Sequence, residues 1–255
     1  MNDNNLRILT GEINLKCYQN IKCSTLAIFS KESYRNNELS VCHTEKLQLP
    51  ECNQVPKYRP YLKVVEGSLT KEEIIKEQNI LTFVLFNPSH ANQYTLDDTI
   101  ENCAYVASIK GYIGFEILNL LNIRNPNIKN IIPNCKNNNY NCYPDIKDII
   151  IFEKVVLAWG LNKNKYFKEM ETSWNKFFKL FHKQDNKYYY LQKDSDEDIK
   201  TRHLGNQGWN CSKCKFQENF SDKNESRIQL KLINNDNRNV IIKIRKSGKI
   251  ETTYI

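Results

Sequence analysis

Three largely apolar runs of strand length constrain the fold of this chain more than any other feature. They are residues 81–86, 115–121 and 149–158. A run without regular polar alternation is typical of a strand that is buried on both faces, as in a parallel sheet covered by helices. Shorter strands are predicted at 25–29, 61–65 and 188–191.

Two helices are predicted between these strands. Asp98-Thr99-Ile100-Glu101 has the form of a capping box, with Asp98 as the N-cap, and Gly111 is placed to end that helix. The second helix spans about residues 163–183 and carries one apolar stripe, formed by Phe167, Met170, Trp174, Phe177 and Phe181. We interpret the stripe as core packing rather than as a platform for stacked bases.

This order of elements predicts an α/β fold, a three-layer α/β/α sandwich with a mostly parallel central sheet. We assign residues 57–208 to this core, 1–56 to an N-terminal segment of unassigned role, and 209–255 to a small β-rich C-terminal extension. In the extension, strands are predicted at 227–233, 239–246 and 249–254, with a hairpin turn at Ser247-Gly248.

Unusual polar residues follow the ends of the predicted core strands. Asn87 follows the first strand, Asn119 to Arg124 follow the second, Trp159-Gly160 the third and Arg202-His203 the fourth. Ligands of parallel sheets bind beyond the carboxyl ends of the strands. The sequence therefore predicts a binding site where these residues meet.

Five short motifs occur in order along the chain. They are FNPSHA at 86–91, DDT at 97–99, NLLNIR at 119–124, AWG at 158–160 and RHL at 202–204. Together they resemble a bacterial and phage family called domain of unknown function 1643. The family pattern has Pro where this sequence has Leu204, and it has one more residue between Asp and Thr than Asp98-Thr99 allows.

That family in turn resembles the uracil-DNA-glycosylase-like superfamily, here from about Phe83 to Trp209. The resemblance implies that Asn87 positions the attacking water, like the Asn of the Asn-Pro-Gly loop in mismatch-specific glycosylases. It also implies that His203 stabilises the leaving base, like the His of their His-Pro loop. Asp97 is the third candidate catalytic residue and is equally suited to a role at the start of the helix.

The resemblance also implies a surface that binds DNA and a base flipped out of the stack. Its candidate residues are Pro88, Ser89, Asp98, Asn119, Arg124, Trp159, Gly160 and Arg202. These residues also have structural alternatives. Asp98 is suited to capping a helix, Asn119 to bonding backbone groups at a strand end, and Trp159-Gly160 to a pocket wall or a tight turn.

The function predicted on this basis is a DNA glycosylase that hydrolyses the N-glycosidic bond of a modified or damaged base. Antiviral defence against phages with modified DNA is one setting for such an activity. Two alternatives stay open: a non-catalytic module that binds a nucleotide or modified base, and a hydrolase of free nucleosides or nucleotides. Salt distinguishes the last of these, because phosphate contacts make affinity for a duplex fall steeply as salt rises.

Nine cysteines and the absence of a signal-like N-terminus predict free thiols and a cytoplasmic location. Cys211 and Cys214 have the spacing of half a structural zinc site, which residues 17–52 would have to complete with Cys or His. Free thiols and a redox role are the alternatives to zinc. No cofactor is expected to be required for the chemistry.

The net charge of +8 lies in one part of the chain. Residues 161–255 hold 20 Lys and Arg against 12 Asp and Glu, which accounts for the whole excess. These residues would either neutralise DNA phosphates or form a solvated lysine-rich surface. DNA is the expected partner, protein partners are unspecified, and no membrane association is expected because no apolar run approaches roughly 18 residues.

Overall fold

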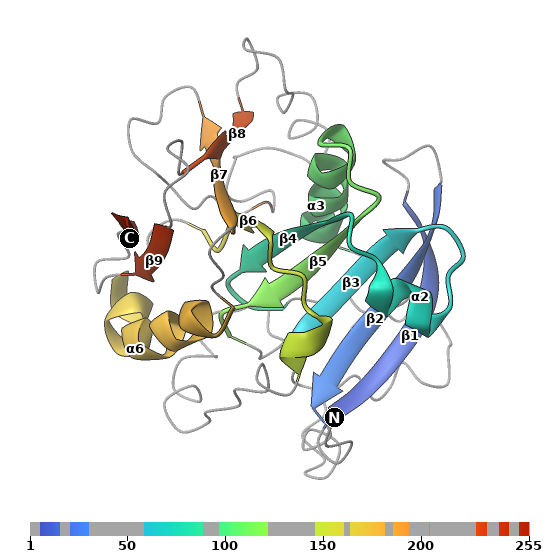
Figure 1. The fold of residues 1–255 in the computed structure, drawn as a ribbon, viewed down its shortest axis with the longest axis horizontal. Helices are drawn as coiled ribbons and strands as arrows, with labels where there is room; N and C mark the ends of the chain where they lie inside the picture. Colours follow the sequence, from blue (N-terminus) through green and yellow to red (C-terminus); the bar gives the residue numbers. More distant parts are fainter. Residues whose placement is uncertain are drawn as a thin grey trace.

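The computed structural model describes residues 6–15, 21–30, 59–88, 97–121, 146–160, 164–181, 186–193, 204, 228–233, 240–244 and 250–254. Figure 1 shows their arrangement. The strands are β1 (Leu6–Leu15), β2 (Ile21–Ser30), β3 (Tyr61–Glu66), β4 (Ile80–Leu85), β5 (Gly114–Asn119), β6 (Lys154–Leu157), β7 (Lys187–Lys193), β8 (Ile228–Leu232), β9 (Val240–Ile244) and β10 (Ile250–Tyr254). The helices are α2 (Lys71–Lys76), α3 (Asp98–Ile109), α6 (Asn164–Phe181) and the short 3-10 helix η4 (Lys147–Ile149).

Eight of the described strands form one mixed sheet, in the order β1-β2-β3-β5-β4-β6-β7-β8. The neighbours β5-β4-β6-β7 are parallel. The pairs β1–β2, β2–β3, β3–β5 and β7–β8 are antiparallel. The prediction of an α/β fold is confirmed, but the prediction of a mostly parallel sheet is wrong on both sides of the four central strands.

The antiparallel side of the sheet comes largely from the N-terminal segment, where the sequence had predicted a single strand. β1 pairs with β2 over the full length of both strands, and β2 pairs with β3. In β1, Ile13 and Leu15 are buried whereas Glu12 and Asn14 are exposed, which is the period-two pattern of an edge strand. At the other edge, β8 of the C-terminal extension pairs with β7. The strands β9 and β10 form a separate antiparallel pair, as the predicted hairpin requires.

Helices pack against both faces of the sheet and give three layers. Successive side chains of a strand point to opposite faces. Phe83 of β4 accordingly belongs to the core that contains Ile100 and Cys103 of α3. Val84 belongs to a second core, which contains Trp174 and Phe177 of α6. The sheet therefore lies between α3 on one face and α6 on the other.

The start of α3 lies one residue away from the predicted position. Asp97, rather than Asp98, is the N-cap, since Asp97 Oδ1 accepts a hydrogen bond from the Ile100 N–H at 3.1 Å. The predicted capping box of Asp98 and Glu101 is wrong, because Ile100 occupies the third helical position. Asp98 is exposed in the first turn, where a negative charge complements the helix dipole.

The end of α3 agrees with the prediction. Gly111 has a φ of 79°, a left-handed conformation that glycine adopts at little cost. Its N–H bonds the Ser108 carbonyl at 2.8 Å, and the Tyr112 N–H bonds the Ala107 carbonyl at 3.0 Å. This pair of bonds is a Schellman motif, which satisfies carbonyls at the helix end.

The third predicted strand is shorter than expected. Of residues 149–158, only Lys154–Leu157 form β6, and the chain before them turns at Phe152, whose φ is 45°. That left-handed conformation is unfavourable for an aromatic residue. It is held by Glu116, whose Oε1 accepts hydrogen bonds from the N–H groups of Ile151 and Phe152, both at 3.1 Å. The prediction failed because these amides bond a side chain instead of a neighbouring strand.

Glu116 is the centre of a buried polar cluster that the sequence analysis did not identify. Its side chain is fully buried in the middle of β5. Oε1 also accepts from the Thr82 hydroxyl at 2.7 Å, and Oε2 accepts from the Tyr61 hydroxyl at 2.8 Å. Burial, together with the charge of Glu116 and its hydrogen bond, holds the pKa of Tyr61 well above its ordinary value. One carboxylate thus joins β3, β4 and β5 to the segment before β6.

Lys63 brings a positive charge to the same cluster. It lies opposite Glu116 in the pairing of β3 with β5 and is 1% exposed. Its ammonium donates to the carbonyls of Glu77 at 2.9 Å and Ile75 at 3.3 Å. Burial lowers the pKa of Lys63, while the charges of Glu116 and Glu77 oppose that shift. The buried carboxylate is therefore partly compensated by a cation on the neighbouring strand.

The interpretation of the aromatic stripe of α6 as core is confirmed where the structure describes its side chains. Trp174, Phe177 and Phe181 are buried. The Phe152 ring centroid lies 5.1 Å from that of Phe181 and 6.1 Å from that of Phe177. The side chains of Phe167 and Met170 lie outside the described residues. These rings pack the segment before β6 against the helix.

Burial of the Tyr188 hydroxyl predicts a loss of stability at alkaline pH. Burial raises the pKa of Tyr188 from 10.0 to about 12, and the hydrogen bond from Asn186 opposes the shift. The unfolded chain releases this proton at lower pH than the folded chain. The stabilisation is therefore complete below pH 10.0 and is lost as the pH rises to about 12.

We expect the melting temperature of the native protein to fall over this interval and that of Tyr188→Phe to fall less. The measurement is thermal unfolding by circular dichroism at closely spaced pH values. Identical pH profiles for the two proteins would contradict the assignment.

Candidate functional site at the carboxyl edge of the parallel strands

The carboxyl ends of β4, β5 and β6 lie in register at one edge of the sheet. Leu85, the last residue of β4, is paired with Asn119, the last residue of β5. The Leu120 N–H bonds the Leu85 carbonyl at 2.9 Å, and the Ala158 N–H bonds the Val84 carbonyl at 2.9 Å. Because neighbouring strands are about 4.8 Å apart, the residues that follow these three strands are brought together.

The chain changes direction across the sheet at this edge. β4 leads into α3 and then to β5 on one side, whereas β6, on the other side of β4, leads into α6 and then to β7. α3 and α6 pack on opposite faces. Because α3 and α6 lie on opposite faces of the sheet, their first turns diverge beyond the carboxyl ends of β4 and β6. In open α/β sheets this switch point is where ligands bind.

Asn87 and Pro88 lie at the switch point, directly after β4. Pro88 is buried and Asn87 is partly exposed. Asn87 Nδ2 donates a hydrogen bond to the Pro88 carbonyl at 3.1 Å, which fixes the direction of the amide. Ser89 lies outside the described residues. The structure thus places Asn87 and Pro88 of the FNPSHA motif at the edge where a ligand is expected.

Asn119, Trp159 and Gly160 lie on either side of Asn87 along the same edge. Asn119 is fully buried and Trp159 is 1% exposed, so both belong to the inner wall of this edge and not to its outer surface. The Trp159 ring packs against Phe178 of α6 with centroids 5.9 Å apart. Its indole Nε1 is buried and has no acceptor among the described residues. Gly160 has a φ of 102°, a conformation that lets the chain turn sharply after β6.

Leu204 shows where the RHL motif meets the sheet. Leu204 is fully buried in the same core as Leu85 and Ile100, and its carbonyl accepts from Asn102 Nδ2 of α3 at 2.7 Å. The motif therefore ends beside the first half of α3, near the carboxyl edge. Arg202 and His203 lie outside the described residues, and so does Arg124. The predicted meeting of Asn87 and His203 stays a prediction.

The chain matches the family described as Protein of unknown function (DUF1643) over residues 68–203. The match covers more than half of the 255 residues. The chain belongs to this family. Searches of the curated proteins and of the solved structures each found no match.

The region shared with the DUF1643 family contains the parallel part of the sheet. It includes β4, α3, β5, β6, α6 and β7, whereas β1–β3 and β8–β10 lie outside it. All the candidate site residues except the cysteines at 211 and 214 fall inside it. The family match and the switch point therefore select the same part of the molecule.

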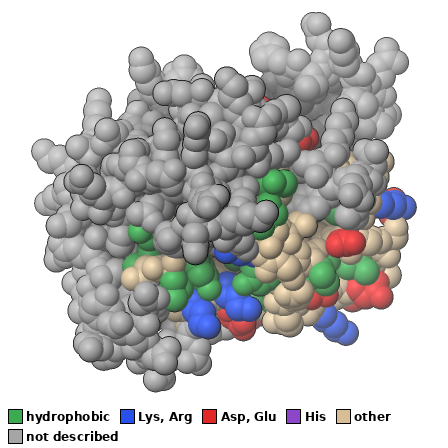
Figure 2. Space-filling view, turned by 90° about the horizontal axis from the view of Figure 1, so that it is seen from above, with side chains coloured by type: hydrophobic (Ala, Val, Ile, Leu, Met, Phe, Trp, Pro, Cys, Tyr) green, Lys and Arg blue, Asp and Glu red, His purple; other side chains and the backbone are tan. Residues whose placement is uncertain are grey.

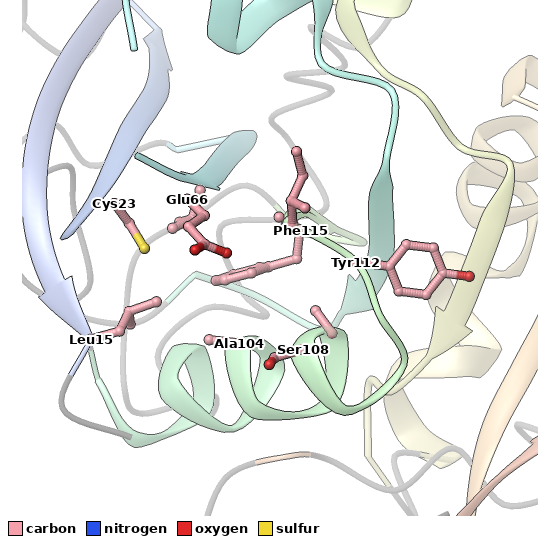
Figure 3. Close-up of a pocket in the computed structure, with 11 residues that line it drawn as sticks. Leu15, Cys23, Glu66, Ala104, Ser108, Tyr112 and Phe115 are labelled. Atoms are coloured by element: carbon pink, nitrogen blue, oxygen red, sulfur yellow. The ribbon is translucent and has the colours of Figure 1, made fainter. Parts of the chain in front are cut away.

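A separate pocket lies at the opposite end of the parallel strands in this DUF1643 protein. It has an empty volume of about 310 Å³, part of it open to solvent, and contains none of the predicted site residues. Figure 3 shows Phe115 between Ala104 and Ser108 of α3 on one side and Cys23 and Glu66 on the other. Its lining is mostly apolar, so its chemistry differs from that of the carboxyl edge.

The described residues of this DUF1643 protein include no group of three or more His, Cys, Asp or Glu that could hold a metal ion. Cys23 and Cys103 are buried and are not in a disulfide. Burial raises the pKa of Cys103 well above its ordinary value, and the charge of Asp97 adds to the shift, which disfavours the thiolate form. Cys211 and Cys214 lie outside the described residues, and the zinc prediction is not tested there.

The surface of the described segments carries both signs of charge. Figure 2 shows acidic and basic side chains interspersed over the described part of one face. The excess of Lys and Arg lies after residue 160, where the structure describes few side chains. In the described ranges, no helix combines the length and apolarity needed to cross a membrane.

Proposed function

We propose that this DUF1643 protein is a DNA glycosylase that hydrolyses the N-glycosidic bond of a modified or damaged base. The proposal takes the carboxyl edge between β4 and β6 as the site of the reaction. It is supported above all by the position of Asn87 at the switch point, between Asn119 and Trp159. The likeness of the Asn87-Pro88 and RHL motifs to glycosylase loops supplies the chemistry, and the fold as a whole is proposed to be uracil-DNA-glycosylase-like.

The proposed reaction needs few titrating groups. Water adds to the sugar C1′ as the bond from C1′ to the base nitrogen breaks, and the electron pair of that bond leaves with the base. The water gives up one proton to solvent as it adds, and the anionic base takes up one proton from solvent after it is released. The Asn87 amide orients the water, and its bond to the Pro88 carbonyl holds that amide in one orientation. The His203 imidazole bonds the negative charge that develops on the base. Arg202 and Arg124 bind phosphates of the flanking DNA.

Release of free base from duplexes that carry different modified bases tests this proposal. Free base is measured by mass spectrometry, and abasic sites are measured by alkaline strand cleavage. We expect both products from at least one duplex and none from the unmodified control. A protein that binds these duplexes but makes no abasic site on any of them is not a glycosylase for them.

A second candidate function is a non-catalytic module that binds a nucleotide or a modified base. It is favoured by Asp97, because this candidate catalytic carboxylate is engaged in capping α3. A binding module also needs no group that activates water. The same duplex panel separates the two functions, since a binding module retains salt-sensitive affinity and releases no base.

Replacement of Asp97 separates its capping role from a catalytic role. Asn and Asp cap helices equally well, so Asp97→Asn is expected to keep the native stability, whereas Asp97→Ala is expected to lose about 1 kcal/mol. If the carboxylate also takes part in the reaction, Asp97→Asn lowers the rate of base release about tenfold or more. The matched control is Glu72→Gln, which removes a carboxylate from an exposed position in the first turn of α2, away from the candidate site. Full activity in Asp97→Asn would limit Asp97 to the cap.

A further inference from the structure

Asn102 of α3 makes a buried contact with a residue 102 positions further along the chain. Its Nδ2 donates to the Leu204 carbonyl at 2.7 Å, and both residues are 0% exposed. A buried amide that bonds a distant carbonyl is costly to break, because the carbonyl is then left without a donor in an apolar environment. The contact is therefore a strong attachment between α3 and the end of the RHL motif.

The Leu204 side chain adds a second attachment at the same point. It packs in the core with Leu85, the last residue of β4, and with Ile100 of the first turns of α3. Leu85 ends β4 and Ile100 is in the first turn of α3, so both are near the carboxyl edge where Asn87 lies. The family pattern has Pro at this position. Leu204 lacks the fixed φ of Pro, and its apolar side chain packs in the core. One residue is thus held by its backbone and its side chain together.

We propose that Asn102 is a positioning residue that holds Leu204, the last residue of the RHL motif, near the carboxyl edge. The expected effect on base release rests on the proposed function, in which His203 bonds the leaving base. His203 directly precedes Leu204, and neighbouring Cα atoms are about 3.8 Å apart. Anchoring the Leu204 carbonyl restricts where the imidazole is presented. Asn102 itself is buried and does not contact the substrate.

Asn102→Leu tests this role, because leucine has a similar size and no donor. Trypsin cleaves after Lys200 and Arg202, and we expect cleavage there to become about tenfold faster through more frequent local opening. Cleavage at other sites should keep its native rate. In the same variant, kcat/KM for base release should fall about tenfold. Asn102→Ser, whose hydroxyl is too short to reach the Leu204 carbonyl, is the second variant if the leucine variant folds poorly.

The matched control is Asn79→Ala. Asn79 Nδ2 also donates to a backbone carbonyl, that of Gly111 at 3.4 Å, but it is exposed and lies at the opposite end of α3. This variant should match the native protein in both assays. Unchanged cleavage after Arg202 in both Asn102 variants overturns the proposal. Faster cleavage in a protein whose native form releases no base supports the attachment and contradicts the proposed function instead.

Discussion

Replacing Glu116 with alanine is expected to lower the free energy of unfolding by about 3–5 kcal/mol. Glu116 accepts hydrogen bonds from the hydroxyls of Tyr61 and Thr82 and from the backbone amides of Ile151 and Phe152. All these donors are buried, and each loses its partner when the carboxylate is removed. Lys63 loses the negative charge on the neighbouring strand as well. The measurement is equilibrium unfolding in urea.

Two further variants identify the carboxylate as the cause. Glu116→Gln keeps the shape of the side chain but points an amide N–H₂ toward groups that are themselves donors. We therefore expect its free energy of unfolding to lie between that of the native protein and that of Glu116→Ala. Glu153→Gln removes a carboxylate from an exposed position next to the same segment and should change stability by less than about 0.5 kcal/mol. A loss below about 1 kcal/mol in Glu116→Ala would contradict the described cluster.

Replacing Asn87 with alanine is expected to reduce base release about 100-fold or more, with binding of the same duplex retained. The amide is partly exposed at the end of β4, so its removal leaves the core intact. The rate falls because the attacking water loses its orientation, whereas the phosphate contacts are made by other residues. Single-turnover rates and duplex affinity, both at fixed salt, give the two quantities separately.

The same substitution distinguishes the two proposed functions. In a binding module, Asn87→Ala changes affinity, and no chemical step exists for it to slow. Asn79→Ala serves as the control, since it removes an exposed amide from the other end of the sheet. A variant that retains the full rate of base release would remove Asn87 from the reaction.

Local sequence patterns predicted the central elements well. β4 is a continuous apolar run and α6 is long and strongly periodic, and each lies within a few residues of its predicted position. β1 was missed because Glu12, Asn14 and other polar residues interrupt a strand that has only one buried face. The start of α3 was misplaced because Asp97 and Asp98 are adjacent and chemically equivalent as caps. The backbone conformation at Asp97 decides between them.

The tertiary features could not be predicted from local pattern. Glu116 stands inside an apolar run, which is a sign of a buried polar role, but its partners Tyr61 and Ile151 lie 55 and 35 residues away. Likewise, the ends of the strands were predicted from the apolar runs, but the switch point depends on the order β5-β4-β6. That order follows from long-range pairing and has no local signature.

The central claim is that the functional site lies at the carboxyl edge between β4 and β6. It is tested most directly by nuclear magnetic resonance of the labelled protein with a duplex that carries a cationic pyrrolidine in place of one nucleoside, a mimic of the charged sugar. We predict shifts in the side-chain amide of Asn87 and the indole N–H of Trp159, with the backbone signals of Cys23 and Tyr112 unchanged. Shifts at Cys23, Tyr112 and Phe115 around the pocket, with Asn87 and Trp159 unmoved, would contradict the claim.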